Sequence, residues 1–158
     1  MISIRPARHA DCRAIWELHS SAIRQVCGRV YPAEQIEAWA GLLAPDRYQR
    51  VIDELVVVVA EDDLGVVGFG QLDPARCLIQ AVYVLPDRLR SGLGRALLGE
   101  LERRARASGC RELWLMSTLN AVPFYEAMGF GRVGDAMHEL PEGTRLPCVE
   151  MSRPLGEA

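Results

Sequence analysis

The sequence has no pattern of cysteines or histidines that is typical of a metal site. Its five cysteines, at positions 12, 27, 77, 110 and 148, form no CxxC pair, and its three histidines form neither HxxxH nor HExxH. We therefore expect neither a zinc site nor a framework of disulfides. Each cysteine is predicted to be reduced and to pack as a small buried apolar residue.

Long apolar runs and an excess of positive charge are also absent. No apolar run approaches the ~20 residues needed to cross a bilayer, and the opening MISIRPARHADC has no apolar signal core. The net charge is −3 and the sequence pI is about 5.6. These features predict a cytoplasmic protein that binds no membrane and is no general nucleic-acid binder. The 158 residues suffice for one domain with a single core, which we expect to span residues 1–158.

The hydrophobic pattern predicts a mixed α/β or α+β domain built around one sheet. After the alternating ISIRPA strand, apolar residues three or four apart predict a helix from Asp11 that ends at Gly28. YPAEQIEAWAGLL predicts a second helix, and PDRYQRVI a further short helix or turn. LVVVVAE is a continuous β-branched run and predicts a strand covered on both faces. Two more strands, a helix over residues 93–107 that ends at Gly109, the strand RELWLMS, a short helix and two strands complete the order.

A glycine turn joins one of these strands to the helix, in VYVLPDRLRSGLGRALL (residues 82–98). Gly92 and Gly94 lie among Arg88, Arg90 and Arg95, at a helix start, where unpaired N–H groups bind anions. The stretch lacks the third glycine of a dinucleotide-binding turn and the GK[ST] of a P-loop. On its own, the turn fits a tight connection as well as a phosphate site.

A second motif is LNAVPFYEAMGF, residues 119–130. It predicts a short helix that ends at Gly129, with Phe124 and Phe130 in the core. Tyr125 is expected to point another way, which leaves its hydroxyl free to reach a groove.

Together, the two motifs resemble the GCN5-related N-acetyltransferase (GNAT) family. The order of elements along the whole chain is similar to that of a GNAT domain, and the stretches RPA..AD...I..LH and YPAEQIEAWA look like small bacterial members. The resemblance implies an α+β fold with a mostly antiparallel central sheet, in which splayed parallel strands bind acetyl-CoA and helices cover both faces. The chain departs from the family at Leu89, where the glycine turn usually begins with Gln or Arg.

The resemblance also implies roles for individual residues. The pantetheine arm of acetyl-CoA would pair with the main chain near Val82 and Val84, and the pyrophosphate would bind the N–H groups of residues 90–95. Asn120 would contact the cofactor arm, and a turn residue that ends the strand is the less favoured alternative. The implied cofactor-binding residues are Val82, Tyr83, Val84, Arg90, Ser91, Gly92, Leu93, Gly94, Arg95 and Asn120.

The implied reaction is attack of a neutral amine on a thioester, with a main-chain N–H near Val82–Val84 stabilising the oxyanion. Tyr125 would be the catalytic proton donor to the departing sulfur. A tyrosine pKa of about 10 and a thiol pKa of about 8.5 make full transfer uphill by roughly 2 kcal/mol, so Tyr125 is expected mainly to donate a hydrogen bond.

The general base has no assignment, because Gln80 stands where some relatives have an acid. Three side chains stay open as the base, although a solvated or structural role is expected of each: Glu34, His138 and Glu150. Three others are open as lining for the substrate side: Trp39, Tyr31 and Arg24.

The sequence thus predicts an acetyl-CoA-dependent N-acetyltransferase that needs no metal and acts on a primary amine of a small molecule or peptide. Because homodimers are common in the GNAT family, the resemblance also implies a homodimer as a possible oligomeric state. A CoA-binding sensor or interaction module with little turnover is the alternative, which Leu89 and Gln80 favour. A nucleotide-binding α/β domain would need its glycine turn after the first strand, whereas this turn follows the fourth.

Overall fold

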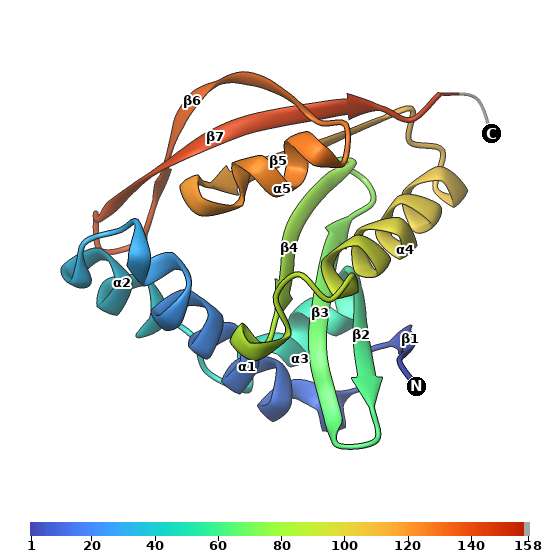
Figure 1. Ribbon diagram of the computed structural model, residues 1–158, viewed down its shortest axis with the longest axis horizontal. Coiled ribbons are helices and arrows are strands. Elements are labelled where there is room, and N and C mark those ends of the chain that lie inside the picture. Colours follow the sequence, from blue (N-terminus) through green and yellow to red (C-terminus); the bar gives the residue numbers. More distant parts are fainter. Residues whose placement is uncertain (157–158) are drawn as a thin grey trace.

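A seven-stranded sheet forms the centre of the computed structural model, which describes residues 1–156 (Figure 1). The spatial order of the strands is β1-β2-β3-β4-β5-β7-β6. The strands are β1 (Ser3–Pro6), β2 (Val56–Asp62), β3 (Gly65–Asp73), β4 (Leu78–Val84), β5 (Glu112–Thr118), β6 (Gly131–Glu139) and β7 (Arg145–Pro154). The helices are α1 (Cys12–Gln25), α2 (Ala33–Ala40), α3 (Arg47–Glu54), α4 (Leu93–Ala107) and α5 (Val122–Ala127). Short 3₁₀ turns are η1 (His9–Asp11), η2 (Cys27–Arg29), η3 (Pro86–Arg88) and η4 (Leu119–Ala121).

Only one neighbouring pair of strands in this sheet, β4 and β5, is parallel among residues 1–156. Their pairing is short, with Leu78 opposite Trp114 and Ile79 opposite Leu115. Beyond these residues, the two strands have no pairing with each other in the described part of the chain. The predicted α+β architecture is confirmed, including the pair of parallel strands that separate.

Helices cover both faces of the sheet, as predicted. On one face, α4 and α5 pack over a core that includes Val58, and on the other, α1 and α3 pack over a core that includes Val57 and Val59. Side chains from β2 therefore enter both cores, because successive side chains of a strand point to opposite faces. The expectation of a strand covered on both faces is correct for this run.

Two glycines of β3 let α4 approach the sheet closely. A Cβ at Gly68 would lie 2.9 Å from Leu97, and a Cβ at Gly70 would lie 2.9 Å from Leu101. Both leucines are fully buried. The close packing sets how near α4 lies to the sheet, and so helps to position the glycine turn that precedes it.

The prediction of five reduced cysteines is wrong for two of them. Cys77 and Cys110 form a disulfide, with their Cα atoms 5.8 Å apart, whereas Cys12, Cys27 and Cys148 are free and buried as expected. Cys77 directly precedes β4, and Cys110 lies just before β5. Parallel pairing brings these two strand starts together, so the bond follows from the fold and has no signature in the spacing of 33 residues.

Two helix ends behave as predicted. Gly109 after α4 and Gly129 after α5 have φ angles of +90° and +92°, which favour glycine.

Phe130 is in the core as predicted, but Phe124, also expected there, is only half buried and lies at the edge of a cavity. Within residues 1–156, no helix has the length and apolar character to cross a membrane.

Candidate active site

A cavity of about 780 Å³ lies where β4 and β5 separate. Residues 79–84 of β4 form one wall, and residues 115–118 of β5 form the opposite wall. The start of α4, the turn η2 after α1, and α5 close the remaining sides. The cavity therefore lies at the open end of the two parallel strands, and the disulfide lies at their other end.

The edge of β4 presents main-chain groups to this cavity. The N–H of Leu85 donates to the carbonyl of Val67 on β3, at 2.9 Å. Along an antiparallel strand, successive residues direct their main-chain groups to alternate sides. The N–H and C=O groups of Val82 and Val84 therefore point away from β3, toward the gap that β5 leaves.

A bulge lies near the start of this wall. The register with β3 shifts between Gln71 and Leu72, which pair with Ala81 and Ile79, so Gln80 has no partner of its own. The Gln71 side chain donates to the Gln80 side chain, which lines the cavity. The pairing of β3 and β4 continues on both sides of the bulge, and bulges are frequent beside functional sites.

The glycine turn brings the start of α4 to the cavity. Gly92 caps the helix with a φ of +87°, and Arg90 also has a left-handed φ, +61°. Ala96 donates to the carbonyl of Gly92 in the first intrahelical hydrogen bond. The N–H groups of the residues between them are the unpaired donors of the helix start. They carry the partial positive charge of the helix dipole.

Gly94 is a position where a side chain would not fit freely. A Cβ there would lie 3.2 Å from two ring carbons of Phe124, which is tighter than ordinary van der Waals contact. Glycine thus keeps open the space between the start of α4 and α5.

The arginines around the turn differ in their surroundings. Arg88 forms an ion pair with Asp62, and the Leu64 N–H and this guanidinium lower the pKa of that carboxyl. Arg90 and Arg95 line the cavity and have no carboxylate partner among residues 1–156. Leu89 is 41% exposed and also lines it. The turn therefore offers two unpaired guanidinium groups beside its main-chain donors.

Tyr125 reaches the cavity from α5. Its side chain is 7% exposed, and its ring packs edge-on against Phe124 and Phe130, with centroids 5.0 Å and 5.7 Å away. Burial raises the pKa of the hydroxyl above its ordinary value. The group consequently keeps its proton throughout the physiological range and can act as a hydrogen-bond donor.

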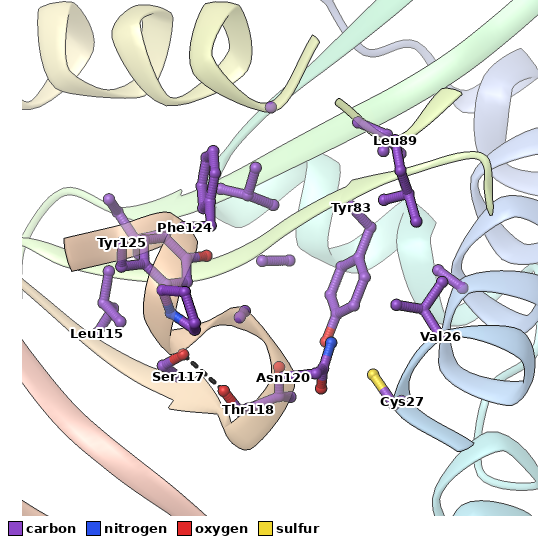
Figure 2. A pocket seen from close by; sticks show the side chains of 18 of the residues that line it. Val26, Cys27, Tyr83, Leu89, Leu115, Ser117, Thr118, Asn120, Phe124 and Tyr125 are labelled. Carbon is purple, nitrogen blue, oxygen red and sulfur yellow. Dashed lines mark hydrogen bonds between the residues drawn. The ribbon is translucent and has the colours of Figure 1, made fainter. Parts of the chain in front are cut away.

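The far end of the cavity is built by side chains from three separate elements (Figure 2). Tyr83 of β4 points toward Asn120 of η4 and Cys27 of η2. Asn120 and Thr118 lie within hydrogen-bonding reach of the Cys27 sulfur, but burial dominates and raises the pKa of the thiol to about 11. The Oδ1 atom of Asn120 is buried and has no hydrogen-bond partner within the described chain.

Behind Tyr83 lies an aromatic cluster. The ring of Tyr83 stacks on that of Phe69, with the ring centroids 5.9 Å apart. The centroid of the His19 imidazole lies 4.5 Å from that of Tyr83. Nδ1 of His19 hydrogen-bonds the hydroxyl of Tyr48 at 2.8 Å. Burial, aided by the charge of Arg47, lowers the pKa of His19 to about 3. His19 is therefore uncharged at neutral pH.

Most of the cofactor and catalytic residues expected from the sequence line this cavity. They are Val82, Tyr83, Val84, Arg90, Gly92, Gly94, Arg95, Asn120 and Tyr125. The side chains of Ser91 and Leu93 do not: the Ser91 hydroxyl donates to the carbonyl of Arg88, and Leu93 is buried in the core. The main-chain N–H groups of Ser91 and Leu93 still belong to the turn.

None of the candidates for the base or the substrate side lines the cavity. Those residues are Glu34, His138, Glu150, Trp39, Tyr31 and Arg24. Arg24 pairs with Glu37 on the surface. The hydroxyl of Tyr31 accepts from the N–H of Leu119 and donates to the carbonyl of Pro147, so it positions η4 against β7.

Two cavity residues were not indicated by any pattern in the sequence: Cys27 and Arg29, which belong to η2, the turn after α1. Helical periodicity places Ala22 and Val26 on one face of α1, but the face that turns toward β4 depends on the packing of the whole domain. Among residues 1–156, no cluster of three or more His, Cys, Asp or Glu side chains is arranged to hold a metal ion. Independence from a metal stays a prediction.

Comparison with known proteins gives the family. Residues 27–143 match the model of the acetyltransferase (GNAT) domain. The chain belongs to the GNAT family. It is 24% identical to the uncharacterized N-acetyltransferase YuaI of Bacillus subtilis, over 98% of this chain and 94% of YuaI. It is 34% identical to the L-amino acid N-acyltransferase MnaT of Escherichia coli, over 68% of this chain and 65% of MnaT.

Solved GNAT structures share the fold. The crystal structure of a GNAT protein from Rhodopseudomonas palustris superposes with a TM-score of 0.90 at 25% identity, over 96% of this chain and 94% of that one. Two further similar structures contain acetyl-CoA. The acetyltransferase YncA of Salmonella typhimurium is 25% identical over 100% of this chain and 96% of that one, with a TM-score of 0.67. The GNAT phosphinothricin acetyltransferase of Sinorhizobium meliloti is 26% identical over 98% of this chain and 89% of that one, with a TM-score of 0.70. The fold and family predicted from the two motifs are thus confirmed: this GNAT protein is an acetyl-CoA-dependent N-acetyltransferase by family, and GNAT acetyltransferases take amine acceptors.

Proposed function

We propose that this protein transfers the acetyl group of acetyl-CoA to the primary amine of a small molecule or peptide, within the cavity between β4 and β5. One observation carries the proposal: the main-chain edge of β4, the unpaired start of α4 and the Tyr125 hydroxyl all face the same space. The similarity to MnaT, whose name gives L-amino acids as acceptors, supports a small-molecule amine.

The residues present fit acetyl-CoA. Two charged guanidinium groups and the unpaired N–H groups of the turn suit a pyrophosphate. The absence of a side chain at Gly94 leaves room beside Phe124. The buried Oδ1 of Asn120 has no partner and can accept a hydrogen bond from the amides of the pantetheine arm. In this proposal Val82, Tyr83 and Val84 hold the arm, and residues 90–95 hold the pyrophosphate.

Acetyl-CoA supplies a thioester carbonyl that an amine can attack. The N–H groups of Val82 and Val84 are the donors directed at this part of the cavity, and they can bind a carbonyl oxygen as it gains negative charge. The hydroxyl of Tyr125 can donate to the departing sulfur. Because burial raises the pKa of Tyr125, full proton transfer is more uphill than it is for an exposed tyrosine, which favours donation of a hydrogen bond.

No carboxylate or imidazole lines the cavity within the described residues. The proton of the attacking amine therefore leaves through water in this proposal, or is absent when the amine binds. We further propose that residues 1–158 act as a single N-acetyltransferase domain in the cytoplasm, without a membrane or nucleic-acid partner and with a homodimer as the oligomeric state to be tested.

A CoA-binding sensor or interaction module is the second candidate. Two observations favour it: the cofactor turn lacks a basic side chain at Leu89, and the wall of β4 carries Gln80 in place of an acid. Such a protein would bind acetyl-CoA with little turnover, so the two candidates differ in one measurable quantity.

The deciding experiment follows thiol release from acetyl-CoA across a panel of primary amines, with Tyr125→Phe as the variant. We expect turnover with at least one amine and a loss of about 100-fold in kcat for Tyr125→Phe, within the range for a positioned proton donor. Acetyl-CoA affinity should change less than threefold, because the ring stays in place. The wild-type rate should not fall up to pH 9, since the raised pKa keeps the Tyr125 hydroxyl protonated.

Tyr48→Phe is the matched control, because it removes a phenolic hydroxyl that bonds His19 outside the cavity. Equal kcat for Tyr125→Phe and the wild type would remove Tyr125 from the chemistry. Tight acetyl-CoA binding without turnover of any amine would favour the sensor.

A further inference from the structure

The ionisable side chains of the cavity are unusually one-sided in charge. The charged residues that line it are Arg29, Arg88, Arg90 and Arg95. No aspartate or glutamate lines it within residues 1–156, and the sequence contains no lysine. A cationic acceptor would meet positive charge here and would find no carboxylate at the cavity wall to bind it.

Three of these arginines are accounted for at the cofactor end. Arg88 forms its ion pair with Asp62, and Arg90 and Arg95 flank the start of α4, where the pyrophosphate is proposed to bind. A bound pyrophosphate would offset the positive charges of Arg90 and Arg95.

Arg29 lies at the other end of the cavity. It belongs to η2, which packs against η4, the turn that carries Asn120. The main chain of η2 is held by hydrogen bonds from the N–H of Arg29 to the carbonyl of Val26, and from Val30 and Tyr31 to that of Cys27. The Arg29 guanidinium has no carboxylate partner among the described residues, although Arg24, one and a half turns earlier, has Glu37.

The pKa of the acceptor amine also favours an α-amine over an alkyl amine of the lysine type. An alkyl ammonium of the lysine type has a pKa of about 10.4, and an α-amino group of a peptide about 7.7–8.0. With no carboxylate or imidazole at the cavity wall, an α-amine enters the neutral state far more readily. In a free amino acid, the carboxylate holds the ammonium protonated, and pairing that carboxylate with a guanidinium removes this effect.

We infer that the acceptor subsite selects an amine that carries an anionic group, of which an α-amino acid is the simplest case, and that the guanidinium of Arg29 contacts that anion. The inference rests on the proposed acetyl transfer. It adds the class of substrate and the residue that binds the anionic group of that substrate. Arginine suits this role because its planar fork binds a carboxylate or a phosphate in bidentate geometry.

The test compares each of the common L-amino acids with its own α-amide, which keeps the side chain and the amine and loses the anion. Spermidine serves as the polycation, and O-phosphoethanolamine as an amine with a phosphate. We measure kcat/KM at pH 8, where spermidine is still a polycation, and divide each value by the fraction of acceptor whose reacting amine is neutral. The wild type should prefer at least one amino acid over its amide by about 10-fold or more and should leave spermidine unacetylated. If Arg29 bound a phosphate and not a carboxylate, O-phosphoethanolamine would have a higher kcat/KM than every amino acid, which would overturn the choice of an amino acid as the acceptor.

The variants identify the residue. Arg29→Gln should lower kcat/KM for the preferred anionic acceptor by about 10- to 100-fold and leave its amide within about twofold, a range expected for one charged hydrogen-bonded contact. Arg29→Lys should restore part of the loss. Arg13→Gln, which removes an exposed charge of α1 that pairs with Glu17 outside the cavity, is the control and should match the wild type.

A second readout does not need turnover. The preferred amino acid should raise the melting temperature of the CoA-loaded wild type, and Arg29→Gln should abolish that rise. Amides or spermidine acetylated as fast as amino acids would overturn the inference while the proposed acetyl transfer stands. An equal loss with amino acid and amide in Arg29→Gln would also overturn it. No turnover of any amine, with acetyl-CoA bound, would count against the proposed function itself.

Discussion

The two ends of the β4–β5 pair contrast sharply in how they are held. At the closed end, Leu78 and Ile79 pair with Trp114 and Leu115, and the disulfide of Cys77 and Cys110 joins the strand starts. At the open end, the strands have no pairing with each other in the described chain, and the cavity takes the place of ladder hydrogen bonds. The closed end is structural, and the open end leaves main-chain groups of β4 available to a ligand.

The contrast explains why a small mixed sheet makes a binding site. The closed end fixes the distance between the two walls, while the start of α4 and the side chain of Tyr125 supply donors at the open end. A change at the closed end should therefore alter stability with little effect on binding. A change at the open end should do the reverse.

The largest expected effect comes from opening the disulfide. The disulfide closes a loop of 33 residues. For a loop of this length, the chain-entropy model gives a stabilisation of about 3–4 kcal/mol. The free energy of unfolding of Cys110→Ser, which cannot form the bond, should therefore be lower by about this amount than that of the oxidised wild type. Urea denaturation with and without dithiothreitol measures it. The affinity for acetyl-CoA should change less than threefold, because the hydrogen bonds of the closed end persist.

The control for this experiment is Cys148→Ala, which replaces a free buried cysteine and keeps the disulfide, so dithiothreitol should lower its stability as much as that of the wild type. If dithiothreitol left the stability of the wild type unchanged, the closed end would not depend on the bond. In the cytoplasm expected from the sequence, where thiols are kept reduced, the reduced value is the relevant one.

A smaller effect is expected at the open end from Leu89→Arg. The variant adds a guanidinium to the turn at an exposed position that lines the cavity. One added charged hydrogen bond should strengthen acetyl-CoA binding by about 1–2 kcal/mol, or about 5- to 30-fold, with little change in stability. Calorimetric titration gives the dissociation constant.

Leu64→Arg provides the matched control, since it adds the same charge at a residue that is 90% exposed in the β2–β3 turn. Equal gains from both variants would indicate a general charge effect and would contradict a specific contact at Leu89. No gain from Leu89→Arg would mean that side chains at this position do not reach the phosphates.

The sequence predicted the glycine-turn end of the cavity, where we propose that the cofactor binds, better than the η2 end, where we propose that the acceptor binds. The turn from Arg90 to Arg95 is a local motif, and its main-chain donors follow from a helix start that the pattern of leucines already marks. Tyr125 and Asn120 were found through a second local motif, although only folding shows that both motifs meet at one cavity.

Part of the acceptor end was missed for a physical reason. Tyr83 of β4 and Asn120 of η4 were expected at the cavity, but Cys27 and Arg29 of η2 were not, because η2 lies far from both in the chain and no spacing relates them. Trp39, Tyr31 and Arg24 were reasonable candidates by composition, yet each lies outside the cavity. The disulfide was missed in the same way, because it depends on the parallel pairing of strands whose starts are set by the whole sheet.

The most direct measurement is a calorimetric titration that compares acetyl-CoA with S-acetylpantetheine, which keeps the thioester and the pantetheine arm but lacks the pyrophosphate and the 3′-phosphoadenosine attached to it. If the start of α4 holds the pyrophosphate, acetyl-CoA should bind at least about 100-fold more tightly, because several charge-assisted hydrogen bonds are lost with the truncated ligand. Equal affinities for the two ligands would contradict the assignment of the glycine turn as the anion site.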